Sequence, residues 1–167
     1  MPRTALVLVD LMPRIIALPT VPHSGEQVHE RCLRLATAVR AAGGLVVWVR
    51  VERPGAQPDG SELATEPSAG DVVVVKNSWG AFPSSGIDGE LRERGIQTVV
   101  LAGIATNFGV ESTGRAADDH GYATVFVSDA MSGLDQHAHD FAVEYVFGKL
   151  GVVVTTDELL AQLPTLE

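Results

Sequence analysis

The sequence has 167 residues, 46% of them apolar, which is enough for one domain to bury a core without disulfides or a bound metal. Its net charge of −9 and pI of about 4.9 argue against nucleic acid or an anionic membrane as partner, because both require a basic surface. The single cysteine, Cys32, cannot form an intrachain disulfide, and the N-terminus MPRTALVLVD lacks the features of a signal peptide. We therefore expect a soluble, cytoplasmic protein that binds a small molecule or another protein.

Short runs rich in Val and Leu alternate with segments of helical length along the whole chain. Strands are predicted at Ala5–Val9, Leu45–Val51, Val72–Val75, Thr98–Leu101, Ala123–Val127 and Val152–Thr155. Helices are predicted at Glu26–Ala42, Gly86–Arg94, Val110–His120, Ala138–Leu150 and from Asp157 onward. Strands that are apolar on both faces and joined through helices indicate a parallel sheet between two helical layers. The prediction is one three-layer α/β/α domain over residues 1–167.

One long segment, Arg53 to Gly70, holds most of the loop-forming residues. Its length predicts a lid or an interface arm rather than a simple connector.

In open parallel sheets, ligands bind beyond the carboxyl ends of the strands, so the residues that follow each strand are the first candidates for a site. In chain order these are Asp10, Glu52 and Arg53, Lys76, Thr106 to Gly109, and Asp129.

Asp10 and Lys76 each end an apolar strand. A carboxyl group there would be partly desolvated, with a raised pKa, and the Lys76 ammonium could pair with it. The alternatives are that Asp10 is only the N-cap of the next helix and that Lys76 is a solvated lysine.

The stretch AGIATNFGVESTGRAA, residues 102–117, combines a glycine at 103, a turn of small residues and a predicted helix start. First-turn amides of such a helix can bind an oxyanion or a carboxylate. Ordinary capping by Thr106 or Asn107 is the competing interpretation.

Three segments together resemble the isochorismatase-like (cysteine hydrolase) superfamily over essentially the whole chain: DLMPRIIAL, KNSWGAFPSSGIDGELRERGI and GIATNFGVESTGRAADDHGY. The resemblance implies a six-stranded parallel α/β fold, a homo-oligomer that is most often a dimer, and a catalytic set of aspartate, lysine and usually cysteine. By position these are Asp10, Lys76 and Gly109. It also implies a cis peptide bond at Ile104–Ala105, before the turn that binds the oxyanion.

The glycine at 109 departs from the amidases of this superfamily, which need a thiolate to form an acyl intermediate. Cys32 is no substitute, because the spacing in HERCLRLATAV predicts that it faces the core. Ser112 and Thr113 are expected to hydrogen-bond to the turn.

Metal and cofactor are not expected. No histidine occurs between His29 and His120, where metal-binding relatives carry their ligands. His120, His137 and His139 are interpreted as solvated residues at helix ends.

True isochorismatases also resemble this chain in having a glycine at the cysteine position, and they cleave a vinyl ether by protonating carbon. Asp10 could be that acid, with Lys76 beside it. Glu52 lies near the position of a glutamine in those enzymes, and Arg50 or Arg53 could meet substrate carboxylates. Trp79, Phe82 and Phe108 are expected either to wall the pocket or to pack in the core.

Two features weaken the match to isochorismatases proper. The motif GIATNFGVEST is closer to a poorly characterised branch of the superfamily, and Met12 stands where many relatives carry glutamine. The leading hypothesis is a hydrolase that uses Asp10 and Lys76 without a covalent intermediate. The alternatives are a silent small-molecule-binding relative and, less favoured, an amidase with Thr106 or Ser112 as nucleophile.

Overall fold

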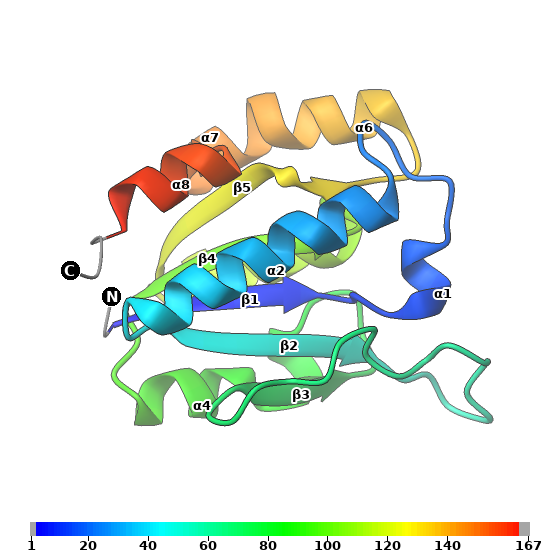
Figure 1. Ribbon diagram of the computed structural model, residues 1–167, viewed down its shortest axis with the longest axis horizontal. Helices are drawn as coiled ribbons and strands as arrows, with labels where there is room; N and C mark the ends of the chain where they lie inside the picture. Colours follow the sequence, from blue (N-terminus) through cyan, green and yellow to red (C-terminus); the bar gives the residue numbers. More distant parts are fainter. Residues whose placement is uncertain (1–2, 164–167) are drawn as a thin grey trace.

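The computed structural model describes residues 3–163, and a twisted sheet of six parallel strands forms its centre (Figure 1). The strand order is β3-β2-β1-β4-β5-β6, and every neighbouring pair is parallel. The strands are β1 (Thr4–Val9), β2 (Leu45–Val51), β3 (Val72–Lys76), β4 (Thr98–Ile104), β5 (Ala123–Ser132) and β6 (Val152–Val154). The predicted three-layer α/β/α fold is confirmed; the ends of the predicted 1–167 domain lie outside the described residues.

The helices largely follow the predicted order. They are α1 (Pro13–Ile16), α2 (Gly25–Ala41), α3 (Phe82–Ser85), α4 (Ile87–Glu93), the π-helix η1 (Thr106–Val110), α5 (Glu111–Asp119), α6 (Gln136–Phe141), the π-helix η2 (Ala142–Phe147), α7 (Gly148–Leu150) and α8 (Thr156–Gln162). The two short helices α1 and α3 were not predicted, and the helix expected from Val110 begins earlier, as η1.

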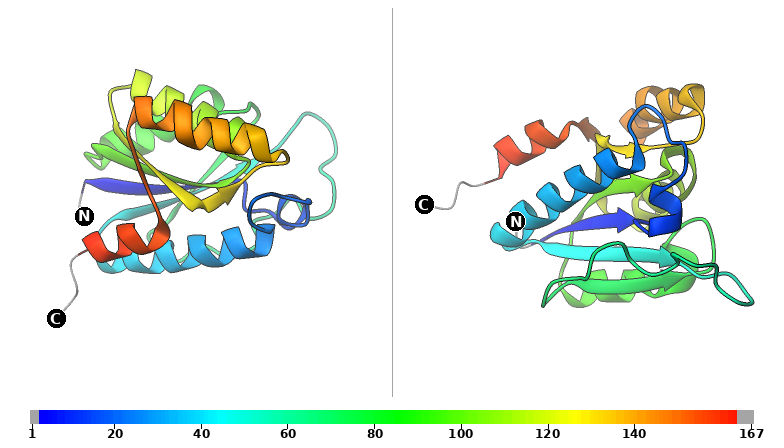
Figure 2. Two further views of the ribbon diagram at one scale, coloured as in Figure 1. Left: turned by 90° about the horizontal axis from the view of Figure 1, so that it is seen from above. Right: turned by 45° about the vertical axis from the view of Figure 1, so that its right-hand side comes forward.

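The side chains of each strand alternate between two apolar layers, which is why the strands carry near-continuous Val and Leu runs. From β1, Leu6 and Leu8 pack with α2 and α8, whereas Ala5, Val7 and Val9 pack with α4, α5 and η2 on the other face. Figure 2 shows α2 and α8 on one side of the sheet and the remaining long helices on the other.

Cys32 lies in the α2 layer, fully buried, and its Sγ contacts the carbonyl of Ala130 at 3.6 Å. Burial raises the pKa of this thiol far above its ordinary value. The prediction that Cys32 faces the core is confirmed.

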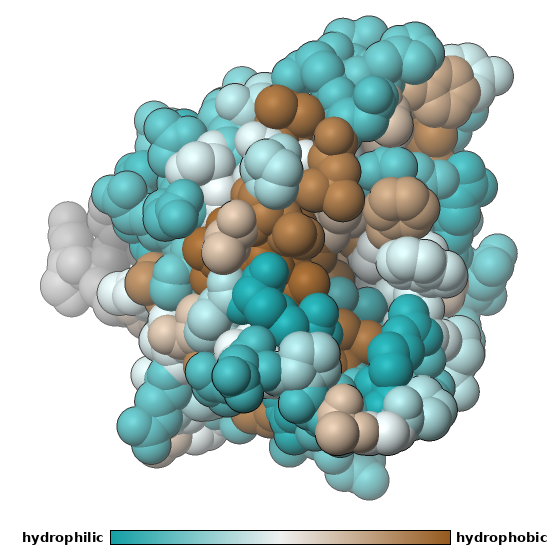
Figure 3. Space-filling view, turned by 90° about the vertical axis from the view of Figure 1, so that its right-hand side faces the viewer, coloured by the Kyte–Doolittle hydropathy of each residue, from teal (hydrophilic) through white to brown (hydrophobic). Residues whose placement is uncertain are grey.

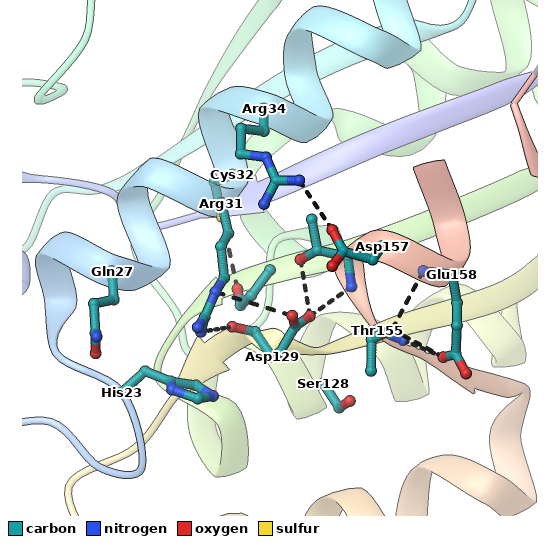
Figure 4. A network of polar contacts seen from close by, with 12 residues as sticks. His23, Gln27, Arg31, Cys32, Arg34, Ser128, Asp129, Thr155, Asp157 and Glu158 are labelled. Atoms are coloured by element: carbon teal, nitrogen blue, oxygen red, sulfur yellow. Dashed lines mark hydrogen bonds and ion pairs between the residues drawn. The ribbon is translucent and has the colours of Figure 1, made fainter. Parts of the chain in front are cut away.

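Asp129, one of the site candidates predicted at a strand end, instead takes part in a network of structural hydrogen bonds (Figure 4). One of its carboxylate oxygens accepts hydrogen bonds from the backbone N–H and the hydroxyl of Thr156, at 2.6 and 2.8 Å, at the start of α8. Arg31 of α2 donates to the Asp129 carbonyl at 2.6 Å. Asp129 therefore ties α2, β5 and α8 together.

The strand order places a switch point between β1 and β4. The chain leaves β1 toward β2 through α2 on one face, and it leaves β4 toward β5 through α5 on the other face. A crevice opens at the carboxyl ends of two strands whose connections diverge in this way.

The segment between β2 and β3, residues 52–71, contains neither helix nor strand and extends along the β3 side of the molecule (Figure 1). Part of it is fixed to the segment after β1, because the N–H of Ala64 donates to the carbonyl of Leu11 at 2.9 Å. Within residues 3–163, no helix is both long enough and apolar enough to cross a bilayer.

Candidate functional site

A cavity of about 250 Å³ lies at the carboxyl edge of the sheet, over the β1–β4 switch point. Its walls come from the last residues of β2, β3 and β4 and from the segments that follow β1 to β5. The lining residues are Asp10, Arg14, Ile15, Leu18, Val51, Arg53, Lys76, Trp79, Ile104, Ala105, Phe108, Gly109 and Leu134.

Asp10 and Lys76 meet at the floor of this cavity. Lys76 Nζ lies 2.8 Å from Asp10 Oδ2 and also donates to the carbonyl of Trp79 at 2.7 Å. Asp10 has a left-handed backbone with φ of 55°, and its N–H donates to the Val49 carbonyl at 2.9 Å. The helix that follows has Met12 as its N-cap, so the capping interpretation of Asp10 is wrong. Lys76 is only 2% exposed, so it is not a solvated lysine either.

The electrostatic environment keeps the Asp10 carboxyl easier to protonate than usual. Burial raises its pKa above the ordinary value of 3.8, although Lys76, Arg14 and Arg53 each act to lower it. Its second oxygen, Oδ1, is buried and has no hydrogen-bond partner among the described residues. An orphaned buried oxygen beside a cavity can bond to a ligand.

Gly109 faces the Asp10–Lys76 pair directly. A Cβ atom built at this position would lie 3.3 Å from Lys76 Nζ and 3.4 Å from Asp10 Oδ2, but only 2.9 Å from Val9 Cγ1. The hydroxyl of Thr113 donates to the Gly109 carbonyl at 2.6 Å, as expected for a residue that supports the turn. A side chain at 109 would therefore point at both charged groups.

The turn before η1 forms the cavity wall next to Gly109. The Ile104–Ala105 peptide bond is cis, as the resemblance implied, and both residues line the cavity. Ala105 is the N-cap of η1 and has no capping side chain, so the prediction that Thr106 or Asn107 caps this helix is wrong.

Thr106 is fully buried and lies outside the cavity lining. Its hydroxyl is 2.8 Å from His139 Nδ1 on α6, and burial lowers the pKa of this histidine. The prediction that His139 is a solvated residue is therefore wrong. His139 was interpreted as a capping residue because it lies close to the start of the predicted helix. Nothing local in the sequence indicates its contact with Thr106.

Trp79 and Phe108 form an aromatic wall at the cavity mouth. Their rings stack with centroids 4.8 Å apart, and they are 58% and 40% exposed. The Arg53 guanidinium lies 5.5 Å from the centroid of the Trp79 ring. In Figure 3, which faces the carboxyl edge of the sheet, apolar side chains gather across the middle of this surface.

Two of the predicted pocket residues lie elsewhere. Phe82 packs against the apolar layer, with its ring 4.9 Å from that of His120 and 6.0 Å from that of Tyr122, which fits the core-packing alternative. Glu52 pairs with Arg50 and borders a separate surface hollow. Arg14, by contrast, lines the cavity and was missed, because only the unpredicted helix α1 turns it toward the site.

Within the described part of the chain, no group of three or more His, Cys, Asp or Glu side chains is placed to hold a metal ion.

The model of the isochorismatase domain matches residues 4–158 of this sequence. The chain belongs to the isochorismatase family. It is 36% identical to the uncharacterised isochorismatase family protein YwoC of Bacillus subtilis, with 96% of this chain and 94% of the relative covered. It is 33% identical to the uncharacterised family protein YecD of Escherichia coli O157:H7, with 96% of each covered. Among solved structures, an isochorismatase family protein from Burkholderia thailandensis is 40% identical and superposes with a TM-score of 0.85, covering 99% of this chain and 97% of the other.

Proposed function

We propose that this isochorismatase-family protein is a hydrolase that cleaves a vinyl ether of a small organic acid, with Asp10 as general acid and without a covalent intermediate. The observation that carries the proposal is the buried Asp10 carboxyl, with its raised pKa, facing the vacant side-chain position of Gly109. Such a site has a proton donor and no nucleophile, and acid-catalysed ether cleavage needs the donor and can proceed without the nucleophile.

The reaction balances with water as the only co-reactant. Asp10 transfers its proton to the terminal CH2 carbon of the enol ether, which becomes CH3 and leaves an oxocarbenium ion at the ether carbon. Water adds to that carbon and returns a proton to Asp10. The resulting hemiketal collapses, breaking its bond to the ether oxygen, and releases an alcohol and a keto product. For an enolpyruvyl ether the keto product is pyruvate.

Lys76 supports this proton transfer. Its ammonium is 2.8 Å from Asp10 Oδ2 and stabilises the carboxylate that forms when the proton leaves. Its hydrogen bond to the Trp79 carbonyl, at 2.7 Å, fixes the position of the ammonium beside Asp10.

The amidase alternative lacks support from the candidate nucleophiles. The Thr106 hydroxyl is turned to His139, outside the cavity lining. Ser112 is absent from the lining as well, and its backbone and Cβ pack against Gly80.

The test is a product screen of purified wild type and Gly109→Cys. Pyruvate release is measured with isochorismate and simpler enolpyruvyl ethers, and ammonia release is measured with small amides. Pyruvate release by wild type, without ammonia release, supports the proposal. Wild type that is inert on every compound, together with amidase activity in Gly109→Cys, would give a different answer. The protein would then be a small-molecule-binding relative without catalytic activity, with a site built like that of the amidases. Ammonia release by wild type also overturns the proposal.

A further inference from the structure

We propose that Arg14 and Arg53 form an anion clamp at the mouth of the cavity that selects substrates carrying a carboxylate. This inference rests on the proposed function, because it names the substrate class of the same site. It concerns ligand binding, however, and can be tested without turnover.

Arg14 is held over the cavity by the segment between β2 and β3. Its Nε donates to the hydroxyl of Ser61 at 3.0 Å, and its backbone N–H donates to the Gly60 carbonyl at 3.2 Å. Ser61 is itself buried, at 6% exposure. Within residues 3–163 the two terminal nitrogens of Arg14 have no hydrogen-bond partner, so an oriented guanidinium keeps donors available for a ligand.

Arg53 reaches the same cavity from the end of β2. One terminal nitrogen donates to the carbonyl of Asn77, and the guanidinium lies beside the Trp79 ring. Its remaining nitrogens have no partner among the described residues. A planar guanidinium fixed at one end suits recognition of a carboxylate, which accepts two parallel hydrogen bonds.

The charge balance of the cavity is opposite to that of the whole molecule. The lining carries three cations, Arg14, Arg53 and Lys76, against one acid, Asp10, in a chain of net charge −9. Lys76 is already paired with Asp10, which leaves the two arginines in excess. Both also act to lower the pKa of Asp10, as expected for cations that share its cavity.

The size and shape of the cavity restrict the ligand further. A cavity volume of about 250 Å³ lies at the lower end of the range for ligand pockets, which favours a small ligand. The stacked Trp79 and Phe108 rings offer a flat apolar wall. These features together favour a compact, unsaturated carboxylate over a neutral amide or a long chain.

The experiment compares the dissociation constants of benzoate and benzamide, two flat ligands of the same shape that differ in charge. Titrations followed by NMR use wild type, Arg14→Met, Arg53→Met and the control Arg94→Met. Arg94 is the C-cap residue of α4, and its guanidinium pairs with Glu90 one turn earlier on an exposed face. We expect wild type to bind benzoate at least about tenfold more tightly than benzamide. Each clamp variant should reduce this preference severalfold while leaving benzamide binding unchanged, and Arg94→Met should retain it.

Ser61→Ala tests the positioning of Arg14. It should weaken benzoate binding without affecting benzamide, whereas a general loss of structure would weaken both. Arg14→Lys should keep part of the preference for benzoate, because lysine retains the positive charge but lacks the paired N–H donors of a guanidinium.

Equal affinity of wild type for the two ligands, or an unchanged preference in both clamp variants, overturns the inference. If the preference depends on the arginines but no vinyl ether is cleaved, the clamp stands and the proposed reaction fails. If vinyl ethers are cleaved and the preference is independent of both arginines, the reaction stands and the clamp fails.

Discussion

Replacing Lys76 with methionine removes the ammonium and keeps a side chain of similar length in the core. Lys76 is 2% exposed and its partner Asp10 is 8% exposed, so the variant leaves a buried carboxyl group without its cation. Breaking a buried pair on one side costs about 3–5 kcal/mol of the free energy of unfolding. The carbonyl of Trp79 also loses its donor. At neutral pH we expect a destabilisation in that range.

The loss should depend on pH in a defined direction. Burial already raises the pKa of Asp10 above 3.8 with Lys76 present, and removing the cation raises it further. The folded variant then binds a proton that the unfolded chain releases. The Asp10 carboxyl of the variant contributes its full stability below the unfolded pKa of about 3.8. This contribution is lost as pH rises through the higher folded pKa, and the free energy of unfolding falls by at most about 1.4 kcal/mol per pH unit. Lys76→Met should therefore be closer to wild type at pH 5 than at pH 8.

Urea unfolding followed by tryptophan fluorescence measures this difference, because Trp48 is fully buried in the folded state. The matched control is Asp10→Asn combined with Lys76→Met. It has no carboxyl group at position 10 to titrate, so its own free energy of unfolding should lack the fall between pH 5 and pH 8 that Lys76→Met shows. A deficit for Lys76→Met that is the same at pH 5 and pH 8, or the absence of any deficit, would refute the reasoning.

Two further changes test the electrostatics and the packing of the structure by its stability, without measuring turnover. Burial would raise the pKa of Asp71, but hydrogen bonds from Arg40 and Trp48 outweigh the effect of burial and lower this pKa below 3.8. The stability that Asp71 contributes is therefore present above pH 3.8 and is lost as pH falls through the folded pKa. Asp71→Asn should cost about 2–3 kcal/mol in urea unfolding at pH 7 and less near pH 3, and an equal cost at both values would contradict this. Gly109→Ala should cost about 1–3 kcal/mol, because its Cβ would lie 2.9 Å from Val9 Cγ1, and less in a Val9→Ala background. A gain of about 1 kcal/mol would show instead that helix propensity decides at this position.

The sheet and its long helices were predictable because their signals are local. The strands β1 and β2 are runs of Val and Leu buried on both faces, and α2 carries its buried residues at helical spacing. The four-residue helices α1 and α3 are too short to show a period. Strand β4 runs three residues beyond its prediction, through Gly103, where a Cβ would lie 2.2 Å from the Val9 carbonyl. That close approach depends on the neighbouring strand.

The site was predictable where it follows from topology. Parallel strands end at one edge, so Asp10 and Lys76 were expected together, and they are in contact. Arg14 depends on the turn of α1 and on Ser61, which lies 47 residues away. The contact between Thr106 and His139 spans 33 residues. Such pairings have no periodic or motif signal in a single sequence, so only the fold reveals them.

The most direct test of the proposed chemistry is the kcat/KM for pyruvate release from an enolpyruvyl ether, compared between wild type and Asp10→Asn at equal concentrations of folded protein. The asparagine keeps the shape of the side chain and cannot donate the carboxyl proton to carbon. If Asp10 is the general acid, the variant loses at least about a hundredfold in kcat/KM. If Asp10→Asn keeps the activity of wild type, Asp10 is not the proton donor and the proposed mechanism is wrong.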